Sequence, residues 1–188
     1  MQNITIVVQD WGGLLGLSLL GAYPERFKRV VILNTFLPSG KPLPAVFKAW
    51  VKYTRYHLSL PIGKIIQRVS FSDIPKEIIA AYDAPFPTKK YKDGARAFPS
   101  IVPGKPTDGG VKEMNHAKKV LGAWQKPSLI LFSDKDKMFS GREKSFLKMI
   151  PDTDQRHHGV IKDAGHFLQE EKGEEIAGWI DRFMKGTL

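Results

Sequence analysis

Three short apolar runs, rich in β-branched residues, occur along the chain, and each is followed by polar residues. Runs of this length predict strands that are buried on both faces, as in a parallel sheet. They occupy residues 4–8, 30–33 and 128–132, and a weaker run at 158–162 predicts a fourth strand. Residues 14–22 are apolar except for Ser18, so they predict a helix and, with the flanking strands, a βαβ unit.

The middle of the chain, residues 35–119, has a different character. It contains many prolines and aromatic residues and no run typical of a strand, which predicts a helical insertion. Short helices are expected at 44–57, 63–68 and 76–83.

Two further helices are expected in the last third of the chain. One spans residues 142–149, and the other has apolar residues at spacings of three and four, namely Ile176, Trp179, Ile180, Phe183 and Met184. We therefore predict an α/β fold in three parts: a first core part at 1–35, a helical cap at 36–119, and the remaining core at 120–188.

Composition narrows the classes of protein. The 188 residues suit one domain, and 42% hydrophobic with 26% charged residues argues against disorder. The absence of cysteine excludes disulfides and thiolate sites. No apolar stretch reaches the roughly 18 residues that a membrane helix needs.

The net charge of +10 raises the question of an anionic partner. The lysines and arginines are scattered and form no run of five, so we interpret them as a solvated basic surface rather than a nucleic-acid site. His157 and His158 are adjacent and would point to opposite faces of a strand, so no metal site is expected.

Three polar residues follow predicted strands, where active sites of parallel sheets collect: Asp10, Asp136 and His166. Asp10 lies between a strand and a helix with Gly12 close behind, which is the layout of a nucleophile elbow in the α/β-hydrolase fold. Their order along the chain, nucleophile then acid then histidine, is also that of this fold. Val8 departs from the small residue often found two places before the nucleophile.

Five segments together resemble haloalkane dehalogenases over nearly the whole chain, the cap included. They are Val7-Val8-Gln9-Asp10-Trp11-Gly12-Gly13, Asn34-Thr35, Ala84-Pro85-Phe86-Pro87, Phe132-Ser133-Asp134-Lys135-Asp136 and Gly165-His166-Phe167-Leu168-Gln169-Glu170. The resemblance implies a partial α/β-hydrolase fold and hydrolysis of small haloalkanes to an alcohol and a halide ion. Water is the co-substrate, and neither metal nor organic cofactor is implied.

The residue types suit that chemistry. A carboxylate that attacks a saturated carbon forms an ester, which water can cleave, whereas a serine would form a stable ether. The resemblance makes Asp10 the nucleophile, His166 the base that activates water, and Asp136 the acid that orients the histidine, with Asp134 as the rival acid.

A leaving halide needs donors that do not ionise, and an indole N–H is such a donor. The resemblance makes Trp11 and Trp50 the halide ligands, although Trp50 also suits a core aromatic. The backbone N–H of Trp11 would serve an oxyanion at the start of the helix.

Complete members of the family carry about four strands before the elbow strand. This sequence contains none of those strands. Strand 4–8 would therefore be an exposed apolar edge, and the other part of the oxyanion hole would be missing. We therefore expect a fragment or a truncated product that alone folds poorly and turns over slowly. When complete, the protein is expected to be monomeric and cytoplasmic.

Two alternatives remain open at this point. An epoxide hydrolase shares the fold and the aspartate nucleophile, and it would use cap tyrosines, for which Tyr53, Tyr56, Tyr82 and Tyr91 are candidates. The second alternative is a protein without catalytic activity, either an inactive fragment or a basic module that binds a small ligand or a partner.

Overall fold

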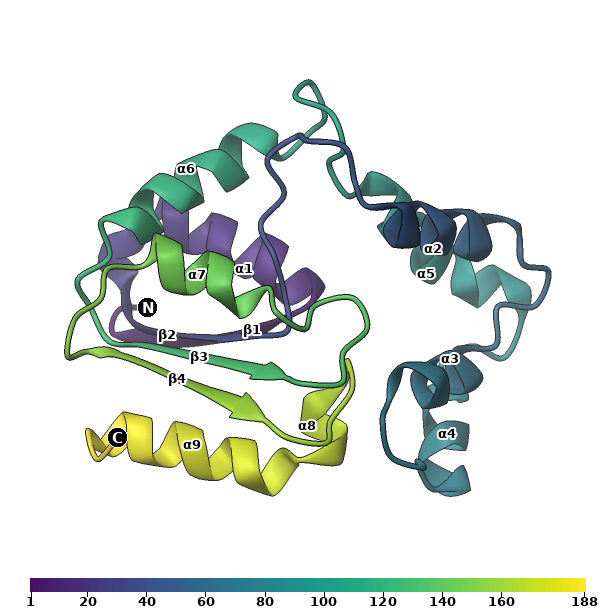
Figure 1. The fold of residues 1–188 in the computed structure, drawn as a ribbon. Helices are drawn as coiled ribbons and strands as arrows, with labels where there is room; N and C mark the ends of the chain where they lie inside the picture. The colour runs from purple at the N-terminus through teal and green to yellow at the C-terminus, as the bar shows by residue number, and fades with distance from the viewer.

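The computed structural model describes residues 1–188 and is built around a four-stranded parallel sheet in the order β1-β2-β3-β4 (Figure 1). The strands are β1 (Ile4–Gln9), β2 (Phe27–Leu33), β3 (Ser128–Ser133) and β4 (Arg156–Ile161). All four predicted strands are confirmed, and so is the α/β fold class.

Helices cover both faces of the sheet (Figure 1). On one face lie α1 (Trp11–Ala22), α6 (Val111–Gly122) and α7 (Glu143–Met149), and on the other lies α9 (Gly173–Lys185), preceded by the short α8 (Leu168–Glu171). Alternate residues of β2 feed the two cores: Val30 and Ile32 pack toward α1, and Val31 and Leu33 pack toward α9. The two separate cores explain why the strands are apolar throughout.

The segment between β2 and α6 contains helices and no strand, as predicted. It comprises α2 (Ala45–Tyr56), α3 (Ile62–Val69), α4 (Lys76–Asp83), α5 (Asp93–Ala97) and two 3₁₀ turns, η2 (Lys89–Lys92) and η3 (Phe98–Ile101); a further turn, η1 (Pro24–Arg26), precedes β2. Figure 1 shows this segment standing to one side of the sheet, beyond the carboxyl ends of the strands.

Helix α6 is not among the predicted helices, because the predicted cap extends to residue 119. Its buried residues Val111, Met114, Ala117 and Leu121 recur at spacings of three and four, so the signal was present. The predicted cap boundary falls inside this helix, and the division into three parts stays a prediction.

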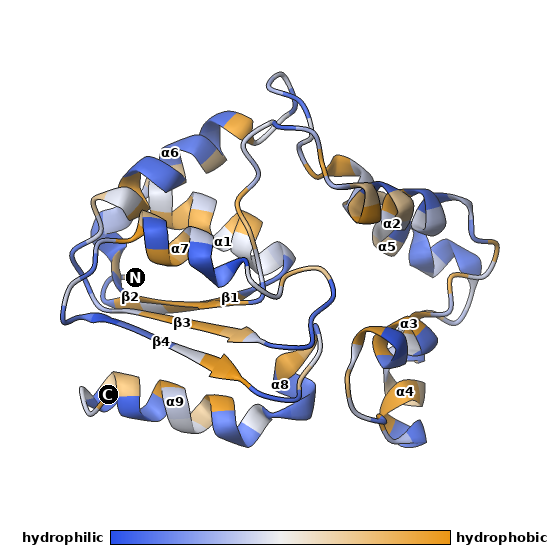
Figure 2. Cartoon of the chain, viewed as in Figure 1, coloured by the Kyte–Doolittle hydropathy of each residue, from blue (hydrophilic) through white to orange (hydrophobic).

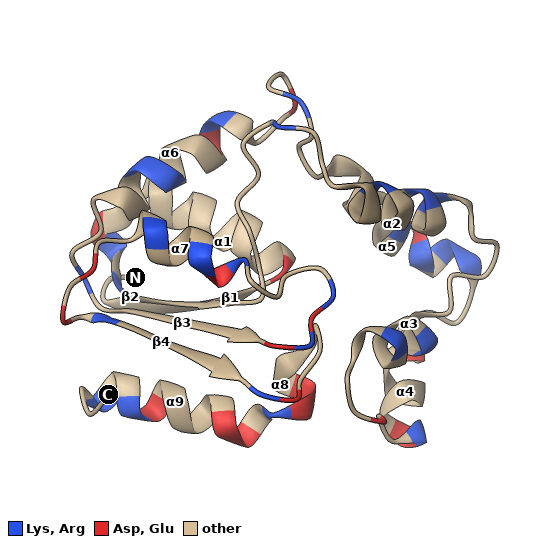
Figure 3. Cartoon of the chain, in the orientation of Figure 1, with Lys and Arg blue, Asp and Glu red and all other residues tan.

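Hydrophobic and charged residues occupy different parts of the structure. Figure 2 shows hydrophobic residues concentrated on the strands and on the helix faces that meet them, and Figure 3 shows Lys and Arg spread over the helices and loops. None of the helices has the length and apolar character needed to span a bilayer.

Strand β1 pairs with β2 alone, so its other edge is open, as expected. Val7 on β1 and Leu15 and Leu19 on α1 are each about half-exposed. Helix α1 is apolar all round, but only the side that carries Leu14, Leu17 and Leu20 is buried against the sheet and α6.

A close approach between α1 and α6 depends on Gly21. A Cβ at this position would lie 2.7 Å from the Cα of Ala117, whereas a Cβ at Gly12 in the same helix would meet nothing. We expect Gly21→Ala to lower the free energy of unfolding by about 1–3 kcal/mol through overpacking. Gly12→Ala should leave it unchanged or raise it by up to about 1 kcal/mol, since alanine favours a helix. Urea denaturation of both variants checks this, and equal stabilities would contradict it.

Candidate active site

Asp10 occupies a strained turn between β1 and α1. Its φ of 47° and ψ of −121° are unusual for a residue with a side chain. Three hydrogen bonds hold the turn: the Asp10 N–H donates to the Asn34 carbonyl (3.0 Å), and the Asp10 carbonyl accepts from the Gly13 N–H (2.9 Å) and the Thr35 hydroxyl (2.7 Å). The side chain is therefore presented at the carboxyl edge of the sheet, as the sequence predicted.

The carboxylate of Asp136 is buried and is held in place by backbone N–H groups. It is 2% exposed, and its Oδ1 accepts the N–H groups of Met138 (2.8 Å) and Phe139 (3.1 Å). Its Oδ2 lies 2.8 Å from Nδ1 of His166. Since Asp136 accepts the hydrogen bond from Nδ1 of His166, the other ring nitrogen, Nε2, faces away from Asp136.

The rival acid, Asp134, lies elsewhere. Its Oδ1 accepts the Asp163 N–H (2.8 Å), and its Oδ2 pairs with Lys135 at 3.3 Å. These contacts with Asp163 and Lys135 lower the pKa of Asp134 against the opposing effect of partial burial. The geometry thus brings Asp136, and not Asp134, to the histidine.

The far side of His166 faces the elbow. Its Nε2 lies 3.5 Å from Oδ1 of Asp10, which closes the sequence Asp136–His166–Asp10. The ring of Phe139 stacks on the imidazole with centroids 5.2 Å apart, and Phe167 meets it edge-on at 5.0 Å. The imidazole is therefore confined between two carboxylates and two phenyl rings.

The environment of His166 favours its charged form. Burial by itself lowers the pKa, but hydrogen bonds to Asp10 and Asp136 and their negative charges outweigh it and raise the pKa of His166 to about 9. A pKa of about 9 favours the imidazolium form of this histidine at neutral pH.

Comparison with known proteins identifies the family of the chain. The family model described as alpha/beta hydrolase fold matches residues 1–173. The chain belongs to this family. Within it, the chain is 39% identical over 185 residues to a haloalkane dehalogenase of Psychrobacter cryohalolentis and 38% identical over 189 residues to one of Mycolicibacterium paratuberculosis.

These matches cover 98% and 100% of the chain but only 61% and 62% of the two relatives, so the chain spans about three-fifths of their length. Among solved structures, a haloalkane dehalogenase from Paraglaciecola agarilytica superposes with a TM-score of 0.84 at 31% identity. That superposition covers 95% of this chain and 60% of the solved one.

The two tryptophans singled out in this α/β-hydrolase chain have different surroundings. Trp11 begins α1, is partly buried, and forms a T-shaped pair with Phe98 at 4.8 Å. Trp50 lies on α2 and stacks on Tyr53 at 5.8 Å, and the two indoles form no aromatic pair with each other. The backbone N–H of Trp11 donates to no acceptor in the protein. Trp11 therefore directly follows Asp10, whereas Trp50 shares with Trp11 only the large core cluster against which both residues pack.

Two polar residues near the histidine were missed as functional candidates. Asn34 is fully buried, and its amide donates to Ser133 Oγ (2.7 Å) and to the Gly165 carbonyl (3.2 Å), so it ties β2 and β3 to the histidine loop. The Gln9 amide donates to the His166 carbonyl at 3.1 Å. Each residue directly follows an apolar run, so its place at the end of a predicted strand could have marked it as a candidate.

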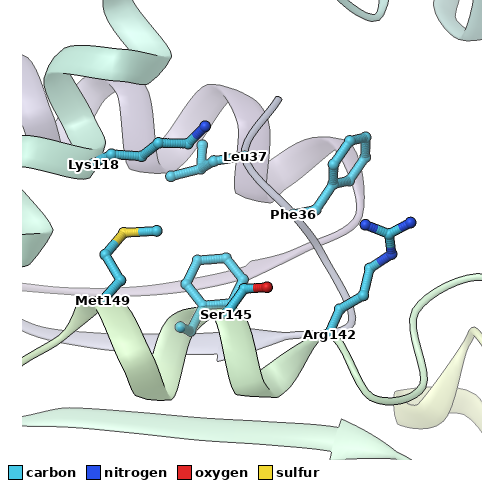
Figure 4. Close-up of a pocket in the computed structure, with 7 residues that line it drawn as sticks. Phe36, Leu37, Lys118, Arg142, Ser145 and Met149 are labelled. Atoms are coloured by element: carbon cyan, nitrogen blue, oxygen red, sulfur yellow. The ribbon is translucent and has the colours of Figure 1, made fainter. Parts of the chain in front are cut away.

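A pocket of about 290 Å³ lies outside this α/β-hydrolase site, between α6, α7 and the segment after β2 (Figure 4). Its lining residues are Phe36, Leu37, Lys118, Arg142, Ser145, Phe146 and Met149. None of Asp10, Asp136 and His166 lines it, so it does not serve as the candidate active site.

The free energy of unfolding should depend on pH through the protonation of His166. A group whose folded pKa (about 9) exceeds its ordinary value of 6.5 contributes stability that is complete below pH 6.5 and is lost as the pH rises to about 9. We expect the free energy of unfolding to fall by about 1–3 kcal/mol across this window. Urea titrations at pH values from about 6 to 9.5 measure it, and the fall should be absent in His166→Gln.

Proposed function

We propose that the protein hydrolyses haloalkanes to an alcohol and a halide ion through an ester on Asp10. The observation that carries the proposal is the alignment of Asp136, His166 and Asp10, with 2.8 Å and 3.5 Å between successive side chains, at a strained elbow. Similarity to proteins named haloalkane dehalogenases supports the choice of substrate.

In the first step, a carboxylate oxygen of Asp10 attacks the carbon that bears the halogen. The carbon–oxygen bond forms as the carbon–halogen bond breaks, and the halide leaves with both electrons. The Trp11 indole N–H and, by the resemblance to haloalkane dehalogenases, the Trp50 indole N–H would stabilise this anion. His166 transfers no proton in this step.

In the second step, water attacks the ester carbonyl carbon of Asp10. Nε2 of His166 takes a proton from the water and then gives it to the departing alkoxide, which leaves as the alcohol. Asp10 is left as a carboxylic acid, and it loses its proton to solvent to restore the carboxylate nucleophile. Asp136 stabilises the transient imidazolium, and the unpaired Trp11 N–H stabilises the oxyanion. The net change is haloalkane plus water to alcohol plus hydrogen halide.

Formation of the ester also prepares His166 for its task. The Asp10 carboxylate is one of the two groups that raise the pKa of His166 in the free protein. Once Asp10 is an ester its charge is gone, so this pKa falls, which favours loss of the imidazolium proton to solvent and the neutral imidazole that can act as a base. The nucleophile therefore holds the base protonated until the base is needed.

The epoxide hydrolase alternative has less support. It needs tyrosines that donate a proton beside Asp10, but Tyr56 and Tyr91 are about two-thirds exposed and Tyr53 stacks between Trp50 and His57. Tyr82 donates to Glu170, and burial together with this carboxylate raises the pKa of Tyr82 to about 12, which makes it a poor acid.

Bromide release from 1-bromobutane and 1,2-dibromoethane tests the proposal. We expect release by the wild-type chain and none above background for Asp10→Ala, because alanine has no carboxylate to attack the carbon. Trp11→Phe should slow bromide release, because it removes an indole N–H that would stabilise the leaving halide. Release that persists in Asp10→Ala, or epoxide opening without bromide release, contradicts the proposal.

A further inference from the structure

Two neighbouring glutamates of α8 join the helical cap to the loop that carries His166. Glu171 Oε1 accepts the N–H groups of Phe71 (2.9 Å) and Ser72 (2.6 Å), which follow α3 in the cap. Its other oxygen, Oε2, accepts the N–H of Gly165 (2.6 Å), the residue before His166. One carboxylate thus holds three backbone donors from two distant segments.

Backbone contacts reinforce this junction. The N–H of His166 donates to the Val69 carbonyl at the end of α3 (2.8 Å). A Cβ on Gly165 would lie 2.3 Å from the same Val69 oxygen, so no side chain fits between the two segments. The peptide before the histidine therefore lies directly on the cap backbone.

The cap segment at the junction is a cross-braced unit. The N–H of Gly63 at the start of α3 donates to Asp83 at the end of α4 (2.9 Å), and the Gln67 amide bridges Ser72 and Ile74 in the connection between them. The hydroxyl of Tyr82 on α4 donates to Glu170 Oε2 at 2.7 Å. Figure 1 shows α3 and α4 apart from α2 and α5, on the side of the cap that faces α8.

We propose that Glu171 is a positioning residue, which couples the position of the His166 imidazole to the position of the α3–α4 pair against α8. This inference rests on the proposed function. A shift of α3–α4 moves the three donors that the carboxylate bridges, and so moves the peptide of Gly165 and His166. Since His166 acts only on the ester, a lost Glu171 slows hydrolysis and leaves alkylation of Asp10 nearly unchanged.

Glu171→Gln is the sharpest variant because the side chain keeps its size. Only one of its two terminal atoms still accepts, so an amide NH₂ faces either the Gly165 N–H or the cap N–H groups. Glu175→Gln is the matched control: the same change at an exposed residue of α9 that makes no side-chain hydrogen bond or ion pair. Tyr82→Phe removes only the hydrogen bond between α4 and Glu170. It provides a milder variant if Glu171→Gln fails to fold.

Rapid-quench kinetics with 1-bromobutane separates the two steps. For Glu171→Gln we expect a bromide burst within about twofold of wild type, steady-state turnover reduced about 10- to 100-fold, and alkylated chain visible by mass spectrometry. Tyr82→Phe should shift turnover in the same direction by about two- to fivefold. Burst and turnover that fall together, or variants that match Glu175→Gln in both, overturn the inference.

A measurement without substrate keeps the inference separate from the proposed function. The downfield NMR signal of the proton shared by His166 Nδ1 and Asp136 reports the position of the ring. We expect this proton to exchange faster with solvent in Glu171→Gln than in wild type and in Glu175→Gln. Unchanged exchange overturns the positioning role even if bromide is released, whereas a protein that forms no alkyl ester overturns the proposed function.

Discussion

His166→Gln is expected to release one equivalent of bromide per chain and then to stop. Alkylation of Asp10 requires no proton transfer, so the first step continues, but no base remains for the water that cleaves the ester. Loss of a general base lowers turnover by about 100- to 10,000-fold. Bromide measured in a rapid-quench experiment gives the burst, and mass spectrometry of the intact protein shows one butyl group attached to Asp10.

The matched control is His158→Gln. His158 lies on β4 with its side chain exposed and with no hydrogen bond or ion pair, so both steps should proceed as in wild type. A His166→Gln chain that turns over without accumulating ester would contradict the assignment of His166 as base. A chain that gives no burst would instead place His166 in the first step.

The core and its reactive edge could be predicted because both depend on local sequence. Buried strands such as 128–132 are apolar throughout, and a polar residue directly after such a run must lie at the carboxyl edge of the sheet. Asp10, Asp136 and His166 each follow a predicted strand, so three positions far apart in the chain could be assigned to one edge.

The cap could be predicted only as helices. Where α3 and α4 sit depends on hydrogen bonds to backbone groups of another segment, as between Glu171 and Phe71, and no periodicity encodes these. In the sequence, Glu170 and Glu171 look like ordinary charges on a short helix. The position of Trp50 relative to Trp11 is uncertain from sequence for the same reason, because it follows from tertiary packing of α2.

Asp136→Asn is expected to lower turnover by about 10,000-fold while the bromide burst remains. Oδ1 accepts the N–H groups of Met138 and Phe139, so the asparagine keeps its oxygen there and turns its NH₂ toward Nδ1 of His166. Nδ1 must then be the unprotonated nitrogen, which leaves the proton on Nε2. An imidazole with a protonated Nε2 cannot take a proton from water beside the ester. Rapid-quench bromide release and mass spectrometry measure the burst and the trapped ester.

Asp134→Asn makes the same change two residues away and decides between the two candidate acids. Asp134 accepts the Asp163 N–H and pairs with Lys135, so its loss should affect stability slightly and leave turnover within about twofold of wild type. If the two variants exchanged these phenotypes, the acid would be Asp134. If both turned over normally, the histidine would not need a buried carboxylate, and the burial of Asp136 at 2% exposure would have only a structural explanation, the closing of the turn at Met138.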